Sequence, residues 1–387
     1  MDPGNWSTDI AGGSAFGYSL LFIILVASLI AIFLQSLAIK QGLATERDLA
    51  QACRDSYPEW AVMILWAIME AAIAATDLAE VIGSAVALKL LFGLPLIAGV
   101  CVTAFDVLVV LFAYGHDFRI LEVIVTALVI VITVCFAVQI GLSKPVALDV
   151  VKGFFPSGQI FSNQNQLLIA IGIIGATVMP HNLFLHSSLV LTRNIDREDV
   201  AMVKEAINYF TFDSTLCLVC ALFVNAAILI VAAATFHVRG LEDVATLEEA
   251  NELLAPILGS GASGVFAVAL LAAGLNSTLT GTLAGQVVME GFLTWKIRPV
   301  YRRLATRCLA IVPAVAVISI GGDKSANELL IISQVVLSVA LPFAIFPLVH
   351  ITSSSLKMGV HVNSRLVMIV ALAIAVFITA LDVFLFI

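Results

Sequence analysis

Long apolar stretches separated by short polar segments run from residue 18 to the end of the chain. Several, such as 20–34 and 366–387, approach or reach the roughly 20 residues that a helix needs to cross a bilayer. The pattern predicts an all-α polytopic membrane protein, residues 1–387 forming one domain with ten full spans and a short one at the N-terminus. The predicted segments are 6–16, 18–42, 59–88, 94–114, 120–141, 166–193, 207–235, 262–292, 303–320, 327–351 and 365–387.

Composition agrees with this pattern, because 61% of the 387 residues are hydrophobic and 12% are charged, whereas a soluble domain carries roughly 25% charged residues. Most of the 19 lysines and arginines fall on one side if the loop 43–58 is cytoplasmic, as the positive-inside rule requires. The acidic outer loop 236–262 is expected to be solvated. The net charge of −8 argues against a nucleic-acid partner, and no basic segment indicates a signal peptide.

Two prolines stand in segments that otherwise resemble membrane helices: Pro3 in DPGN (2–5) and Pro180 in MPHN (179–182). A proline inside a helix has no N–H and leaves the carbonyl four residues earlier unpaired, so Pro180 frees the carbonyl of Ala176. Such breaks persist in a membrane only where protein or a water-filled cavity compensates. An ordinary proline kink is the alternative, but two breaks with polar neighbours favour a binding site.

The groups beside the two breaks are metal-ligand types. Asp2 offers a carboxylate, Asn5 an amide oxygen, Met179 a thioether and Ala176 its freed carbonyl. Hard cations such as Mg²⁺ and Ca²⁺ take oxygen shells, whereas a thioether favours later first-row ions. The sequence therefore predicts a site for a divalent transition-metal ion.

Three acidic residues, Glu70, Asp77 and Glu80, lie within one apolar span. At about 100° per residue, Asp77 lies about 20° and Glu80 about 80° from Glu70, so all three share one helix face. Acids inside a membrane mark an ion or proton pathway by default, and His181 could exchange protons with them. The alternative is that they pair with basic residues flanking other spans, namely Arg193, Arg302 and Arg303.

Two polar residues in other spans need partners. Asn225 is expected to hydrogen-bond a neighbouring helix, and Gln334, in a polar break of the span 327–351, is a candidate gate or auxiliary metal ligand. No HExxH, GxSxG or Walker A motif occurs. The sequence therefore predicts no enzymatic activity and no resident cofactor.

With these residues in place, the chain resembles the Nramp family of divalent-metal transporters. The motifs that carry the resemblance occur in order along the chain: DPGN at 2–5, ATDLAEVIG at 75–83, GIIGATVMPHNLFLHSSLV at 172–190 and GLNSTLTGTLAGQVVMEGF at 274–292. The last is similar to the family's transport signature.

The resemblance implies two inverted five-helix repeats, 1–165 and 166–351, with helices 1 and 6 broken and an extra helix at 365–387. It also implies proton-coupled import of Mn²⁺ and Fe²⁺ through a cell membrane, or a vacuolar or endosomal one in a eukaryote. The implied metal ligands are Asp2, Asn5, Ala176, Met179 and Gln334. The implied proton and polar pathway comprises Glu70, Asp77, Glu80, His181, Arg193, Arg302 and Arg303.

One feature departs from the family pattern. The family places half a helix before DPGN, and here that half would precede Met1. We expect a start upstream of this sequence. The alternative hypothesis is a metal sensor that keeps the fold, binds the ion and does not transport it.

Overall fold

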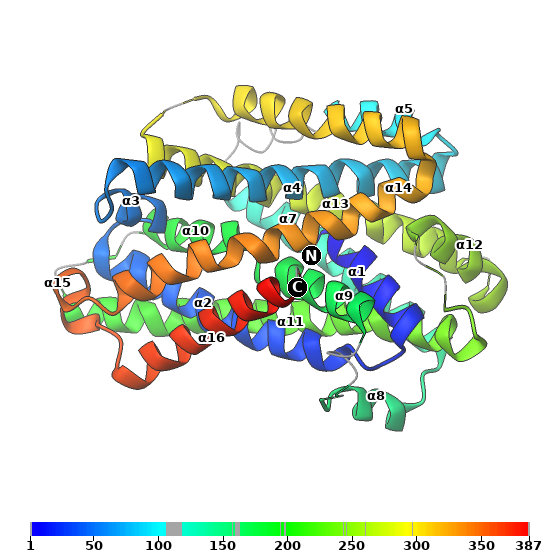
Figure 1. The fold of residues 1–387 in the computed structure, drawn as a ribbon, viewed down its shortest axis with the longest axis horizontal. Coiled ribbons are helices and arrows are strands. Elements are labelled where there is room, and N and C mark those ends of the chain that lie inside the picture. Colours follow the sequence, from blue (N-terminus) through cyan, green and yellow to red (C-terminus); the bar gives the residue numbers. More distant parts are fainter. Residues whose placement is uncertain are drawn as a thin grey trace.

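A computed structural model describes residues 2–105, 118–156, 158, 163–193, 195–196, 199–242, 244, 246–259, 261–295 and 297–385, without the side chains of 118–121, 299–300 and 323–324. The described part is helical, without strands (Figure 1). The long helices are α2 (Leu21–Thr45), α4 (Glu59–Phe92), α7 (Phe118–Ser143), α11 (Val200–Thr235), α13 (Ala262–Leu293), α14 (Pro299–Thr352) and α16 (Arg365–Leu385). The shorter ones are α1 (Pro3–Phe16), α3 (Leu49–Arg54), α5 (Leu96–Val102), α8 (Ala147–Gly153), α9 (Gln164–Val178), α10 (Pro180–Leu189), α12 (Leu247–Leu258) and α15 (Ser355–Met358).

Nine helical segments of the described chain are long and apolar enough to cross a membrane. They confirm every full span predicted from the sequence except 94–114. For that span the structure describes a short apolar helical segment, Leu96–Phe105, and residues 106–114 lie outside the described part. The predicted N-terminal segment 6–16 is longer than expected, because Pro3 is the first residue of α1, a position where its missing N–H is unpaired in any case.

Helix α14 contains two of the predicted spans, 303–320 and 327–351, joined at Gly322. Gly322 has φ 73° and ψ −166°, a backbone conformation that is essentially restricted to glycine. The chain turns back there, and in Figure 1 the orange second half of α14 leaves the yellow-to-orange first half at an angle. The predicted division into two spans is therefore correct.

The N-terminal helix is held at the centre of the bundle. It packs against α11, α9, α14 and α4, and Trp6 is completely buried, with its ring edge-on to Phe136 at 4.8 Å and Phe266 at 5.4 Å. Such aromatic pairs stabilise by about 0.5–1.5 kcal/mol beyond the area they bury. This packing fixes Asn5, the neighbour of Trp6, inside the protein.

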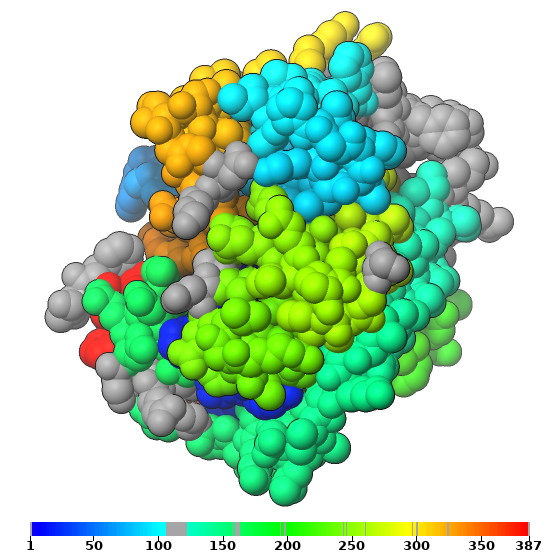
Figure 2. Space-filling view, turned by 90° about the vertical axis from the view of Figure 1, so that its right-hand side faces the viewer, coloured from blue at the N-terminus to red at the C-terminus, as the bar shows by residue number. Residues whose placement is uncertain are grey.

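One end of the molecule is covered by helices from the loops. Figure 2 shows α12 in the middle of that face, with α5 above it and α8 below. Helix α12 begins with a capping box formed by Thr246 and Glu249, which satisfies backbone N–H groups of its first turn. The expectation of a fully solvated acidic loop is wrong for Glu248, which is 9% exposed and lies 3.8 Å from the ammonium of Lys89.

Candidate functional site

The beginning of α1 presents the first group of predicted ligands. Asp2 is the N-cap, and its Oδ1 accepts from the backbone N–H of Asn5 at 2.9 Å. Its Oδ2 accepts from Nε2 of Gln334 on α14 at 3.4 Å. A Cβ on Gly4 would lie 1.8 Å from that Nε2, so glycine at this position is what allows Gln334 to approach. Asp2 and Gln334 are both 0% exposed.

The second group of predicted ligands lies at the break between α9 and α10. The break falls at Met179, whose φ of 46° and ψ of 103° leave the helical region. A non-glycine residue held at such a conformation costs of order 1–3 kcal/mol, which surrounding packing must offset. Pro180 begins α10, so it has no N–H for the carbonyl of Ala176. The amide of Asn182 donates to Met179 Sδ at 3.3 Å, which orients the thioether.

A side chain of α11 connects the two breaks. Asn5 Nδ2 donates to Asn225 Oδ1 at 2.7 Å, confirming the helix-to-helix hydrogen bond expected for Asn225. Asn225 also lines a cavity of about 70 Å³ together with Ala176 and Met179. Asn225 therefore joins Asn5 of α1 to the cavity beside Ala176 and Met179, while Asp2 contacts Asn5 and Gln334.

The amide of Asn5 has a defined orientation, and the residue responsible was not singled out from the sequence. Besides Asn225, its Nδ2 donates to Asp9 Oδ2 at 3.3 Å. Asp9 Oδ2 and Asn225 Oδ1 thus both accept from Asn5 Nδ2, so the NH₂ group of Asn5 faces these two residues. The opposite atom, Asn5 Oδ1, is buried and has no hydrogen-bond partner among the described residues. The signal in the sequence is the i, i+4 spacing of Asn5 and Asp9.

The chemistry of these donors suits a transition-metal ion as substrate. Among the described residues no three His, Cys, Asp or Glu side chains gather into a metal cluster. The available donors are one carboxylate, one or two amide oxygens, a carbonyl and a thioether. Gln334 Oε1, like Asn5 Oδ1, is buried without a partner in the described chain. Unpaired buried acceptors are costly, and a bound cation would satisfy both.

The three acids of α4 share one face, as predicted, and each is paired with an arginine from α14. Arg302 Nη2 lies 2.7 Å from Glu70 Oε1. Arg303 bridges the other two, contacting Asp77 through Nη1 and Glu80 through Nη2, the latter at 2.8 Å. The ion-pairing alternative therefore holds for Arg302 and Arg303. It does not exclude a proton pathway, since buried pairs of this kind also line relays.

Glu80 has further partners that the sequence pattern did not single out. Its Oε1 accepts from Ser277 Oγ at 2.8 Å and its Oε2 from Thr278 Oγ1 at 3.2 Å. Arg307 is a third arginine beside the α4 acids, after Arg302 and Arg303, and its Nη1 lies 3.7 Å from Glu80 Oε2. Ser277 and Thr278 belong to the motif 274–292, and Arg307 follows Arg303 by one helical turn. The position of Ser277 and Thr278 in that motif and the i, i+4 spacing of Arg303 and Arg307 could have indicated these contacts.

Two predicted pathway residues have different surroundings. His181 is 2% exposed in the first turn of α10, and its Nδ1 has no partner in the described chain. Arg193 lies outside the buried network, because its Nη2 pairs at 2.7 Å with Glu122 of α7, and both side chains are more than 40% exposed. The expectation that Arg193 pairs with the α4 acids is therefore wrong. Its sequence position shortly after α10 could not reveal that the chain turns toward α7.

Solved structures with a similar fold support this architecture. A manganese transporter from Eremococcus coleocola, in complex with an aromatic bis-isothiourea substituted compound, aligns with a TM-score of 0.90 and 41% identity, covering 99% of this chain and 82% of that one. The inward-facing conformation of Mhp1 aligns with a TM-score of 0.55 and 14% identity over 100% of this chain and 87% of that one. The likeness to Mhp1 concerns the fold alone. The expected class, inverted repeats with broken helices and an extra helix, is confirmed.

Sequence relatives extend over the whole chain. The protein named divalent metal cation transporter MntH from Listeria monocytogenes serotype 4a is 55% identical over 386 residues, which is 100% of this chain and 86% of the relative. MntH from Bradyrhizobium diazoefficiens is 55% identical over 383 residues, 99% of this chain and 85% of the relative. Both are named as transporters, in agreement with the expectation that the chain is not an enzyme. Residues 1–387 match the family described as natural resistance-associated macrophage protein-like, and the chain belongs to this Nramp family.

Proposed function

We propose that this chain imports divalent transition-metal ions, Mn²⁺ and Fe²⁺, across a bacterial plasma membrane in symport with protons. Relatives that carry the name divalent metal cation transporter support the substrate class, and the similar protein from Eremococcus coleocola is a manganese transporter. The proposal is supported by the hydrogen bond from Asn5, in the first turn of α1, to Asn225, which lines a cavity with Ala176 and Met179 at the break between α9 and α10.

In this proposal the metal ion binds first to Asp2 and Asn5. The Ala176 carbonyl and the Met179 thioether then complete its coordination shell. Gln334 joins as an auxiliary ligand, since its amide already lies against Asp2. The thioether discriminates against Mg²⁺ and Ca²⁺, because these ions gain little from sulfur and lose water ligands that they hold strongly.

Protons take a neighbouring route in this proposal. His181 and Glu80 lie deepest, Asp77 follows with Arg303, and Glu70 follows with Arg302. The Glu70 side chain is 29% exposed, unlike the 0–1% of Asp77 and Glu80, so it forms the outlet of the route. Arg193 acts only at the surface. The repeats 1–165 and 166–351 move relative to each other to expose the site alternately.

The test is Mn²⁺ uptake into proteoliposomes that enclose a pH-sensitive dye. We expect Mn²⁺-dependent internal acidification, and we expect Met179→Ala to admit Mg²⁺ or Ca²⁺. Met202→Ala is the matched control, because Met202 is 50% exposed on α11. A version extended upstream of Met1 is tested in parallel.

Metal uptake without acidification would refute proton coupling. If every version binds Mn²⁺ and none transports it, the sensor hypothesis replaces the importer. If Met202→Ala alters selectivity as much as Met179→Ala does, the thioether at the break is not the selective ligand.

A further inference from the structure

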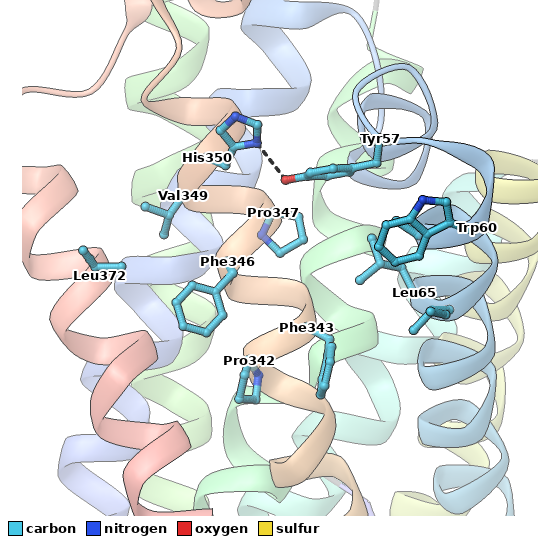
Figure 3. A pocket seen from close by; sticks show the side chains of 12 residues that line it. Tyr57, Trp60, Leu65, Pro342, Phe343, Phe346, Pro347, Val349, His350 and Leu372 are labelled. Atoms are coloured by element: carbon cyan, nitrogen blue, oxygen red, sulfur yellow. Dashed lines mark hydrogen bonds between the residues drawn. The ribbon is translucent and has the colours of Figure 1, made fainter.

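A large groove opens on the outer surface of the bundle, away from the candidate metal site. It encloses about 520 Å³ between the beginning of α4, the second half of α14 and α16, within the roughly 300–1,000 Å³ of small-molecule sites. Figure 3 shows Trp60 and Leu65 on one wall, Phe343 and Phe346 on α14 and Leu372 on α16. The groove lies on helices that are long and apolar enough to cross a membrane, near the start of α4 and the end of α14.

The lining of this groove is almost entirely apolar, and the described part of the chain leaves it uncovered. Trp60 is 69% exposed, and Phe343 and Phe346 are 42% and 40% exposed. Pro342 and Pro347 form part of the floor. A proline ring fills less of the surface than a long side chain, and a proline inside a helix removes one backbone hydrogen bond and favours a kink. The result is a preformed apolar channel rather than a flat helix face.

One end of the groove is polar. Tyr57 Oη lies 2.7 Å from His350 Nδ1 (Figure 3). Burial raises the pKa of Tyr57 to about 12, so the hydroxyl is protonated at neutral pH and can donate to Nδ1. In that arrangement Nδ1 of His350 is the acceptor, so the ring carries its N–H on Nε2, which can donate to a further group.

A cation stands beside this polar end. The ammonium of Lys357, on α15, donates to Ser56 Oγ, and Ser56 directly precedes Tyr57. Tyrosine and tryptophan side chains collect at the level of lipid headgroups, which is where Tyr57, Trp60 and Lys357 would lie. This end is also on the side of the protein that carries most of the basic residues, the predicted cytoplasmic side.

We propose that the groove binds an anionic phospholipid of the cytoplasmic leaflet. One acyl chain lies along Phe343, Phe346 and Leu372, and the phosphate is held by Lys357 and by the Nε2–H of His350. Charge complementarity selects an anionic headgroup, because a cation near the membrane surface attracts anionic lipids. The inference depends on the chain being a membrane protein, and it is independent of which ion is transported.

The experiment compares phosphatidylglycerol with phosphatidylcholine of the same acyl chains, using native mass spectrometry of the full chain in detergent. We expect phosphatidylglycerol to bind more tightly. Lys357→Gln weakens its binding about fivefold, the effect of removing one cation from a lipid-facing surface, and leaves phosphatidylcholine unchanged. Ala61→Trp and Leu372→Trp, which fill the groove from opposite walls, reduce binding of both lipids.

Matched controls separate this site from general adhesion of lipid. Lys152→Gln removes a basic charge on α8, where the side chain is 68% exposed. Ala127→Trp adds an indole to an exposed position on α7. Both controls should bind as the unmodified chain does. Equal binding of the two lipids, or equal losses in the control and groove variants, overturns the proposal.

Discussion

At the scale of single residues, the amide of Asn5 illustrates how a ligand atom is presented. Two acceptors, Asp9 Oδ2 and Asn225 Oδ1, hold its NH₂ group, and its oxygen is left for the ion. Asp9→Asn places an amide at this position, and its NH₂ group can take the place of the accepting oxygen, so the Asn5 amide can turn over. We expect KM for Mn²⁺ uptake to rise about tenfold, equivalent to about 1.4 kcal/mol, while the protein stays folded.

A charge exchange tests the orientation directly. Asp9→Asn combined with Asn225→Asp restores one carboxylate and one amide around Nδ2, and KM should return toward that of the unmodified chain. Asp382→Asn is the matched control. Asp382, on α16, is also a buried acid, and it accepts from Ser338 Oγ of α14 at 2.7 Å. An unchanged KM in the single Asp9 variant would show that the amide needs no such support.

A second residue-scale prediction concerns pH and lies outside the membrane spans. Asp48 caps α3 by accepting from the N–H of Gln51 at 2.8 Å, and burial raises its pKa to about 6. Its pKa in the unfolded chain is about 3.9. The folded state therefore binds the proton more tightly, and stability falls as pH rises from about 4 to about 6. The full loss above pH 6 is about 3 kcal/mol.

Asp48→Asn keeps an oxygen for the cap and removes the charge. The melting temperature of this variant in detergent should therefore depend less on pH between pH 4 and pH 8. As pH rises, its melting temperature should increase relative to that of the unmodified chain. Asp55→Asn, a half-exposed neighbour, should follow the unmodified chain. Parallel curves for Asp48→Asn and the unmodified chain at every pH would contradict the assignment.

At the scale of elements, the apolar runs were long enough to locate nine spans without any tertiary information, since a membrane imposes length and hydrophobicity on each helix separately. The face shared by Glu70, Asp77 and Glu80 followed from helical periodicity alone. The ion-pair partners of these acids could not be predicted in this way, because they depend on how the helices pack. Arg193 was grouped with Arg302 and Arg303 although it pairs with Glu122.

Short amphipathic elements could not be predicted in the same way. Helix α12 lies in a segment whose acidic side chains suggested a solvated loop, yet it begins with a capping box and buries Leu247 and Leu254. Its apolar face becomes meaningful only when α1, α4 and α13 offer a surface to cover. The role of Asp9 was missed for a related reason: only the structure shows which way the amide of Asn5 points.

The reversal inside α14 gives a prediction about one element. Gly322 adopts a conformation that other residues avoid, and a Cβ there would meet nothing within 4 Å. Gly322→Ala therefore acts through the backbone alone, and we expect a loss of about 1–3 kcal/mol in stability. Gly264→Ala in α13 is the control, since a Cβ there also meets no atom within 4 Å and its backbone is helical. Thermal unfolding in detergent measures both, and equal melting temperatures would exclude strain at Gly322.

At the scale of the whole molecule, the predicted ligands are buried among the helices of the described chain. Asp2 is 0%, Asn5 1% and Met179 6% exposed, and the cavity that Met179 lines holds only about 70 Å³. An ion cannot enter or leave without a rearrangement of the helices around it. Transport therefore requires at least one further conformation in which solvent reaches the breaks.

Solvent access during turnover can be measured at Ala176, which is 2% exposed and lines the cavity. In a chain whose 6 cysteines are replaced by alanine, Ala176→Cys keeps the carbonyl and adds a thiol. A membrane-impermeant thiol reagent should modify it slowly at rest. With Mn²⁺ and an inward proton gradient, modification should speed up about tenfold, because a shift of about 1.4 kcal/mol toward open conformers raises their population by that factor. Lys152→Cys, at an exposed position on α8 on the predicted outer side, reports reagent activity and should react equally in both conditions. A rate at Ala176→Cys that ignores both metal and gradient would mean that the broken helices stay closed, and the site would then bind an ion without passing it on.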